Sequence, residues 1–404
     1  MLGETCPRLR SDIEVLLVEE SDEQALLLQD PEHYAPEVAR LAPAAVALLR
    51  YFDGRHSFAR MAERLAAQGA EGINVEDLRS FADELDRHYL LDSARFAAER
   101  GRREAYLSSP LREAAHAGAA YPADPEGASA FLDGMLALAP RRRKRRLRRL
   151  IAPHIDLRLG AETYAWAHRR LAAAGRPDLV IVLGVCHARA DEDFIACRKD
   201  FATPLGVVRH DGAFLDALEA RLGRSLTDGD LVHRDEHSVE FQTLWLAHLW
   251  PGDPPPIVPF LVRGFHGCVQ RGATPAGDPP TEAFLEALRA TIDEDPRDIL
   301  LLASVDLAHM GPMYGHGARL GAEEERQMAL DDGALLDPVV RGDAEGFFRA
   351  VAEGCNHRNI CGVGPIYVAL RLGGGPGELL RYGQGRIHPE SGSVVSFAAL
   401  AFPD

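Results

Sequence analysis

From residue 147 onward, short apolar runs alternate with amphipathic stretches. The apolar runs have the length and composition of buried strands and lie at residues 147–153, 179–183, 257–262, 299–303 and 394–400. Stretches with helical spacing of apolar residues lie among them, at residues 163–174, 212–222, 241–249, 281–292 and 323–330. This alternation predicts an α/β fold with a mixed, largely parallel central sheet flanked by helices.

The N-terminal region follows a different pattern. Apolar runs at 13–18 and 24–28 flank a polar turn, which predicts a β-hairpin. Three helices are expected after it, the first at residues 44–52, the second capped by Ser57 and the third at residues 75–89. A short strand is expected to follow at residues 90–92. This order is typical of a small α+β, winged-helix-like domain. We therefore expect that domain at residues 1–95, a polar linker at 96–112 and the α/β domain at 113–404.

Composition narrows the class of protein. The chain has 404 residues, of which 46% are hydrophobic and 26% charged, as in ordinary globular proteins. It contains no apolar run of about 18 residues, so a membrane-spanning helix and a membrane partner are not expected. Six scattered cysteines and the lack of a secretory signal favour a reduced, cytoplasmic protein. The net charge of −16 argues against nucleic acid as a partner.

One segment departs strongly from this acidic balance. Residues 140–149 read PRRRKRRLRR. Such a run could contact a phosphate or an acidic partner, and it could equally be a solvated loop or helix end before a strand. We favour the solvated loop, because the run has no interleaved aromatic residues of the kind that bind nucleic acid.

Polar residues suited to chemistry follow several of the predicted strands. They are His154 and Asp156, Cys186 and His187, and Asp306 and His309. Because loops at the carboxyl ends of parallel strands line the ligand crevice in such folds, we expect one shared site. His237 opens a predicted helix, capped by Ser238 or Asp235, where the helix dipole would keep its imidazole neutral.

A cysteine stands in a Gly-rich turn before the predicted helix at 366–372. That position predicts a lowered pKa for Cys361, although a buried structural cysteine is the alternative. Two histidines, a cysteine and a nearby aspartate suit Zn(II), Fe(II) or copper better than Mg(II) or Ca(II). The sequence has no CxxC pair, HExxH motif or GxSxG elbow, so any metal site is assembled from distant strands.

The order of these motifs resembles the Memo family, which includes the AmmeMemoRadiSam system protein B. The resemblance covers about residues 113–402 and is carried by HAGAAYPADP, IAPHID, VIVLGVCH, TPLG, DEHSVEFQ, IVPFLV, SVDLAHMG and NICGVGPI. It implies a fold similar to the LigB-like non-haem iron dioxygenases. The N-terminal region resembles the PqqD-like winged-helix domains, which bind leader peptides or partner proteins.

The Memo resemblance also implies which residues form the site. It places the metal ligands at His154, His187 and Cys361, and catalytic neighbours in the pocket at His237, Asp306 and His309. The sequence departs from the family at Asp156, a further ligand or a partner of His154. It departs again at Cys186, which is either a soft ligand or an inert neighbour.

Two functions follow as hypotheses. The first is a redox or dioxygenase-like enzyme in a modification pathway, with iron or copper most expected and zinc as an alternative that would favour hydrolysis. Its substrate would be a small molecule or peptide, and the resemblance suggests a radical-SAM protein as partner. The second is a non-catalytic adaptor that binds peptides or proteins in the same pocket.

Overall fold

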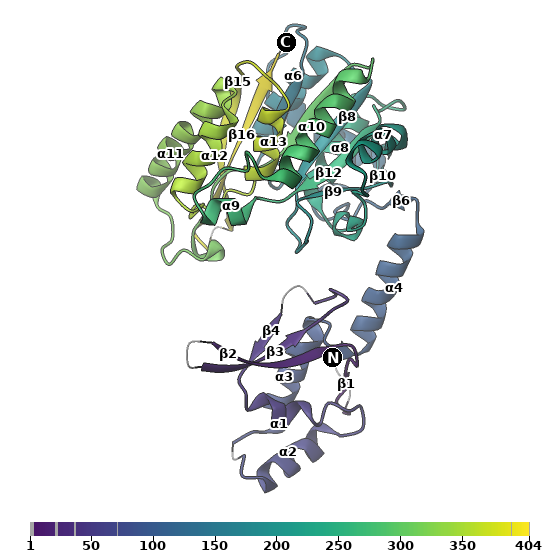
Figure 1. Ribbon diagram of the computed structural model, residues 1–404, viewed down its shortest axis with the longest axis vertical. Coiled ribbons are helices and arrows are strands. Elements are labelled where there is room, and N and C mark those ends of the chain that lie inside the picture. The colour runs from purple at the N-terminus through teal and green to yellow at the C-terminus, as the bar shows by residue number, and fades with distance from the viewer. Residues whose placement is uncertain (1–3, 21–22, 36–37, 71, 389, 404) are drawn as a thin grey trace. The chain divides into compact units, whose positions relative to one another are not determined.

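Figure 1 shows the computed structural model of the chain, which describes residues 4–403 except 21–22, 36–37, 71 and 389. The chain divides into two compact units, Met1–Ser108 and Ser109–Asp404. Each unit has its own hydrophobic core, since the buried residues around Phe58 and Leu78 form a cluster separate from those of the second unit.

The N-terminal unit combines an antiparallel sheet with short helices. Its sheet has the order β2 (Glu14–Glu20), β3 (Glu23–Gln29), β4 (Ala39–Leu41). The helices are α1 (Ala45–Leu49), α2 (Phe58–Ala67), α3 (Val75–Arg87) and α4 (Ala94–Ser108), and β1 (Arg8–Leu9) pairs with β5 (Leu91–Asp92). The predicted hairpin is confirmed, with residues 21–22 of its turn outside the described residues.

The predicted helices and the Ser57 cap of α2 are also confirmed. The pattern does not predict β4, because three residues are too few to show a period of two. The likeness of this unit to a PqqD-like winged helix stays a prediction.

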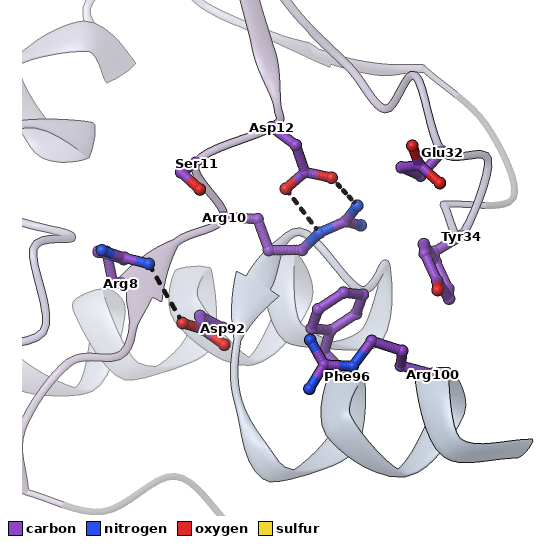
Figure 2. A pocket seen from close by; sticks show the side chains of 9 residues that line it. All are labelled: Arg8, Arg10, Ser11, Asp12, Glu32, Tyr34, Asp92, Phe96 and Arg100. Carbon is purple, nitrogen blue, oxygen red and sulfur yellow. Dashed lines mark hydrogen bonds and ion pairs between the residues drawn. The ribbon is translucent and has the colours of Figure 1, made fainter. Parts of the chain in front are cut away.

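A buried guanidinium joins the loops of the N-terminal unit to α4. The Nη atoms of Arg10 lie 2.9 and 3.0 Å from the carboxylate oxygens of Asp30, and both side chains are 2% exposed. The guanidinium also lies 4.2 Å from the ring centre of Phe96 and 5.0 Å from that of Tyr34. Figure 2 shows Arg10, bonded to Asp12, beside these rings in the wall of a cavity of about 350 Å³.

A mixed sheet forms the centre of the second unit (Figure 1). Its order is β14-β16-β7-β13-β8-β12-β9, with β15 paired to β16. The bounds are β7 (Arg149–Ala152), β8 (Leu179–Val185), β9 (Phe194–Ala196), β12 (Ile257–Val262), β13 (Ile299–Ser304), β14 (His309–Met310), β15 (Glu378–His388) and β16 (Ser393–Phe402).

The predicted α/β class is confirmed, but the sheet is parallel only in its centre. Strands β7, β13, β8 and β12 run parallel, whereas the outer strands β9, β14, β15 and β16 are antiparallel to their neighbours. Strands β15 and β16 are consecutive in the chain, and a short connection between neighbouring strands favours the antiparallel arrangement.

Helices cover both faces of this sheet. Alternate residues of the central strands belong to separate hydrophobic clusters. The cluster of Ile181 includes side chains of helices α7, α10, α11, α12 and α13, whereas the cluster of Val182 includes side chains of α6 and α8. Their bounds are α6 (Ala161–Ala174), α7 (Gly212–Leu222), α8 (His237–Leu249), α10 (Pro279–Glu294), α11 (Ala322–Arg341), α12 (Ala344–Glu353) and α13 (Val363–Arg371). Shorter elements complete the unit: β6 (Leu111–Arg112), α5 (Pro125–Leu136), β10 (Asp200–Thr203), β11 (Gly206–Val208), η1 (Asp230–His233), α9 (His266–Gln270) and η2 (Pro312–Tyr314).

Most predicted elements of the second unit are confirmed, with shifted ends. Helix α8 begins at His237, as the segment around His237 predicts, although the apolar spacing indicates it only from residue 241. Helix α11 extends to Arg341 instead of ending near residue 330. Among the described residues, no helix has the length and apolarity that crossing a membrane requires.

Helix α13 approaches the central sheet so closely that its second residue must be glycine. A Cβ atom on Gly364 would lie 2.0 Å from the carbonyl oxygen of Arg263. We therefore expect Gly364→Ala to lower the free energy of unfolding by about 1–3 kcal/mol, because the helix has to shift. Urea denaturation followed by circular dichroism measures this change.

Gly333 provides a matched control within α11. A Cβ there meets no atom within 4 Å, so Gly333→Ala should raise the free energy of unfolding by about 0.5–1 kcal/mol. Equal effects of the two substitutions would contradict the close approach of α13.

Candidate metal centre

The candidate residues collect at one edge of the sheet. His154 follows β7, His187 follows β8 and Asp306 follows β13. These strands run parallel, so their carboxyl ends meet at the same edge. The residues come together although they lie up to 152 positions apart in the sequence.

The first turn of α8 is fastened to this edge. The hydroxyl of Ser238 accepts a hydrogen bond from the N–H of Val185 at 3.1 Å, and the hydroxyl of Ser304 donates to the carbonyl of Ser238 at 2.6 Å. The amide of Gln242 donates to the carbonyl of Pro153 and to Ser304 Oγ, each at 2.9 Å. These buried bonds fix His237, the first residue of α8, beside the strand ends.

Three imidazoles form a group that could hold a metal ion. One ligand atom from each of His154, His187 and His237 lies within 4.8 Å of the others. Their ring centres are 5.0–5.1 Å apart, and the rings of His187 and His237 stack at 19°. His154 is buried, whereas the side chains of His187 and His237 are 38% and 32% exposed, so one side of the group is open to solvent.

Hydrogen bonds orient two of these rings. His154 Nδ1 lies 2.9 Å from the carbonyl oxygen of Ser304 and donates to it. His187 Nδ1 lies 3.0 and 3.1 Å from the carboxylate oxygens of Glu236. In its neutral form each ring therefore keeps Nε2 as the nitrogen with a lone pair, as metal-ligating histidines do. The same carboxylate lies 3.3 Å from Nδ1 of His237.

The charge states of two of the three imidazoles also suit metal binding. Burial and the neighbouring His187 lower the pKa of His154 to about 3, and burial and His154 lower the pKa of His237 to about 3. Burial opposes the charge of His187, but Glu236 outweighs it and raises the pKa of His187. His237 is thus neutral as predicted, although burial is the main cause. The predicted cap at Ser238 or Asp235 is wrong: Glu236 caps α8.

Cys361 belongs to the same cluster. Its Sγ lies 3.4 Å from His154 Nε2 and 3.5 Å from the carbonyl oxygen of Asp306. The prediction of a lowered pKa is wrong, because burial and the Asp306 carboxylate raise the pKa of the thiol well above its usual value. Burial likewise raises the pKa of Asp306 to about 6, which leaves this carboxyl close to titration at neutral pH.

Three further candidate residues, His309, Asp156 and Cys186, form hydrogen bonds to the backbone of nearby residues. His309 donates from Nδ1 to the carbonyl of Leu307 at 3.0 Å, and the pKa of its imidazole is lowered by burial. Asp156 accepts hydrogen bonds from the N–H groups of Arg158 and Leu159, which is a local turn. Cys186 donates to the carbonyl of Ala188, and burial raises the pKa of its thiol to about 11.

A buried ion pair fixes a further histidine near the cluster. Arg112 and Glu240 pair with both side chains fully buried. The Glu240 carboxylate also accepts the backbone N–H groups of Ala115 and His116, at 3.1 and 2.9 Å. The His116 ring consequently lies edge-on to His237, with 5.8 Å between ring centres.

Sequence reasoning missed Glu236, Ser304 and Glu240. A carboxylate directly before His237 was visible in the DEHSVE segment, but it is indistinguishable there from an ordinary helix cap. Ser304 contributes a backbone carbonyl, which no residue type predicts.

Comparisons with known proteins agree on one family. The family model described as Memo-like protein matches residues 112–401. A MEMO1 family protein of Aquifex aeolicus is 26% identical over 365 residues, which cover 89% of this chain and 91% of that protein. The MEMO1 family protein MK0963 of Methanopyrus kandleri is 29% identical, with 63% of this chain and 82% of the relative covered.

Similarity to solved structures is weaker. The uncharacterized protein JW3007 from Escherichia coli K12 aligns over 64% of this chain and 100% of its own, at 14% identity and a TM-score of 0.33. This likeness supports no argument about the site.

Glu236 offers a direct test of the cluster. In Glu236→Gln, a single amide oxygen replaces a carboxylate that faces two imidazoles, so at least one ring loses its orientation. We expect the affinity for Zn(II) or Co(II) to fall about 10–100-fold. Competition with a chromophoric chelator measures the affinity.

The neighbouring Asp235→Asn is the matched control, because this exposed carboxylate pairs with Arg234 and with no ring of the cluster among the described contacts. Wild-type affinity in Glu236→Gln would contradict the orienting role of Glu236.

Proposed function

Because this chain belongs to the Memo-like protein family, we propose that its histidine cluster binds a divalent transition metal used in a redox or dioxygenase-like reaction. The observation that carries the proposal is the group of His154, His187 and His237, whose nitrogens lie within 4.8 Å of one another at an open edge of the sheet. Imidazole nitrogens beside a thiol suit iron, copper or zinc. Iron or copper fits an oxidoreductase, whereas zinc would fit a hydrolase.

The proposed ligands are His154, His187 and Cys361. His237 competes with Cys361 for the third place, because its ligand atom completes the histidine group whereas Cys361 Sγ lies 3.4 Å from His154 Nε2. Binding through sulfur requires the thiol to release its proton, which a nearby cation favours. A metal held in this way would supply a Lewis acid and a one-electron redox centre.

Asp306 and His309 are the proposed proton carriers, with His237 in the same role if it does not bind the metal. Burial raises the pKa of Asp306 to about 6, so its carboxyl can take up and return a proton near neutral pH. Its Oδ2 lies 3.6 Å from His154 Nε2, and this distance supports a proton-carrying role beside the cluster. His309 is held by its bond to the carbonyl of Leu307.

The proposed substrate is a small molecule or a peptide in a modification pathway. Two resemblances of the sequence support this: a LigB-like fold for the second unit and a PqqD-like module for the first, which would present a peptide. The alignment with the Aquifex relative covers more of the chain than residues 112–401, so it extends into the first unit. A radical-SAM protein is the proposed partner in that pathway.

Metal content tests the proposal. Untagged protein is purified without oxygen as wild type, His187→Ala, His237→Ala and Cys361→Ser, and its metals are measured by mass spectrometry. We expect about one equivalent of iron or copper in the wild type and its loss in His187→Ala. The sulfur ligand predicts a thiolate-to-metal absorption band that disappears in Cys361→Ser.

His210→Ala is the control, since this half-buried imidazole pairs with Asp200 away from the cluster. About one equivalent of zinc would move the proposal to a hydrolase. Wild-type protein that neither contains nor takes up a metal would overturn the enzyme proposal and favour a peptide-binding adaptor.

A further inference from the structure

The basic segment before β7 is unused by the metal centre. Eight of the nine residues from 141 to 149 are Arg or Lys, in a chain whose net charge is −16. The segment has no helix or strand before Arg149, as expected for a loop that precedes a strand. Its charge density sets it apart from the rest of the molecule.

Helix α6 anchors the backbone of this segment. Arg170, itself 4% exposed, donates from its two Nη atoms to the carbonyls of Arg145 and Arg146, each at 2.8 Å. The guanidinium of Arg142 lies 4.4 Å from the ring centre of Trp166 on the same helix. Leu147 is buried in the core. These contacts hold the backbone of the segment in place, and we refer to residues Arg141–Arg145 as the ridge.

Four of the five charges of the ridge are not neutralised. Arg141, Arg143, Lys144 and Arg145 are exposed, and within the described part of the chain none of them forms an ion pair with a carboxylate, whereas Arg142 lies 3.9 Å from Glu378. Arg170 adds a further positive charge beneath them, and its pKa is lowered by burial and by Arg145. Holding like charges together costs free energy, which a bound anion offsets.

A cavity adjoins the end of the ridge. It has a volume of about 490 Å³ and a mixed lining, in which Asp293 and Asp295 lie with the apolar Ile299, Leu301 and Leu372 and with Arg146 and Arg148. Both arginines pair with Asp298, at 2.9 and 3.7 Å. The segment that follows the ridge thus borders an opening whose mixed lining includes apolar side chains.

We propose that the ridge Arg141–Arg145 binds an acidic, extended polypeptide segment of a partner protein, followed by an apolar side chain that enters the adjoining cavity. Five extended residues span about 16 Å, the reach of a short acidic run. Nucleic acid is disfavoured because residues 141–149 include no aromatic residue, and the neighbouring half-buried Trp166 ring is already engaged by the Arg142 guanidinium. A short segment also avoids the repulsion that the acidic remainder of the chain exerts on a large polyanion.

Fluorescence anisotropy with the full-length protein tests this. The probe is a labelled peptide with a run of glutamates followed by leucine, at low ionic strength. We expect saturable binding that weakens as salt increases. The triple variant Arg141→Glu, Arg143→Glu, Lys144→Glu should weaken it at least about tenfold, because attraction becomes repulsion. Replacing the leucine of the peptide by glycine should weaken it less.

The matched control is the triple variant Arg271→Glu, Arg326→Glu, Arg349→Glu, because these three arginines are exposed elsewhere on the same unit. Its affinity should equal that of the wild type, and circular dichroism verifies that both triple variants fold. No binding at low salt, or equal binding by the ridge variant, would overturn the proposal. Tighter, ridge-dependent binding of single-stranded DNA or phosphatidylserine vesicles would also overturn it, by assigning the ridge to another class of partner.

Discussion

The arrangement of the histidine cluster depends on the carboxylate of Glu236. It caps α8, accepts a bond from the His187 ring and lies against the His237 ring. One buried group thereby joins a loop after β8 to a helix that comes 49 residues later. Because the central strands are parallel, this joint lies at the edge where β7 and β13 deliver His154 and Asp306.

Burial then decides the chemistry of the cluster. Burial keeps the imidazoles of His154 and His237 neutral and keeps the Cys361 thiol protonated. It also raises the pKa of Asp306 to about 6. Neutral imidazoles are ready to bind a cation, whereas the thiol has to lose a proton first. Metal binding through Cys361 is consequently coupled to proton release, and a carboxyl that titrates near neutrality stands beside it.

Part of the cluster could be predicted from the sequence because three of its residues follow strongly apolar strands. His154, His187 and Asp306 are placed at one edge by strand direction alone. Two of the outer antiparallel strands were not predicted, since β9 and β14 are too short to show a period. The raised pKa of Cys361 was unpredictable for a different reason: helix position is visible in a sequence, but the depth of burial and the approach of Asp306 are not.

The contacts that anchor the cluster could not be predicted from the sequence for the same reason. Glu236, Ser304 and Glu240 act through geometry formed by residues distant in sequence, and Ser304 acts partly through its backbone. Anomalous diffraction from crystals of the anaerobically purified protein, on both sides of the absorption edge of its metal, would show whether the histidine cluster holds that metal. We expect a single anomalous peak bonded to the imidazoles of His154 and His187. A metal bound elsewhere, with no peak between these rings, would contradict this expectation.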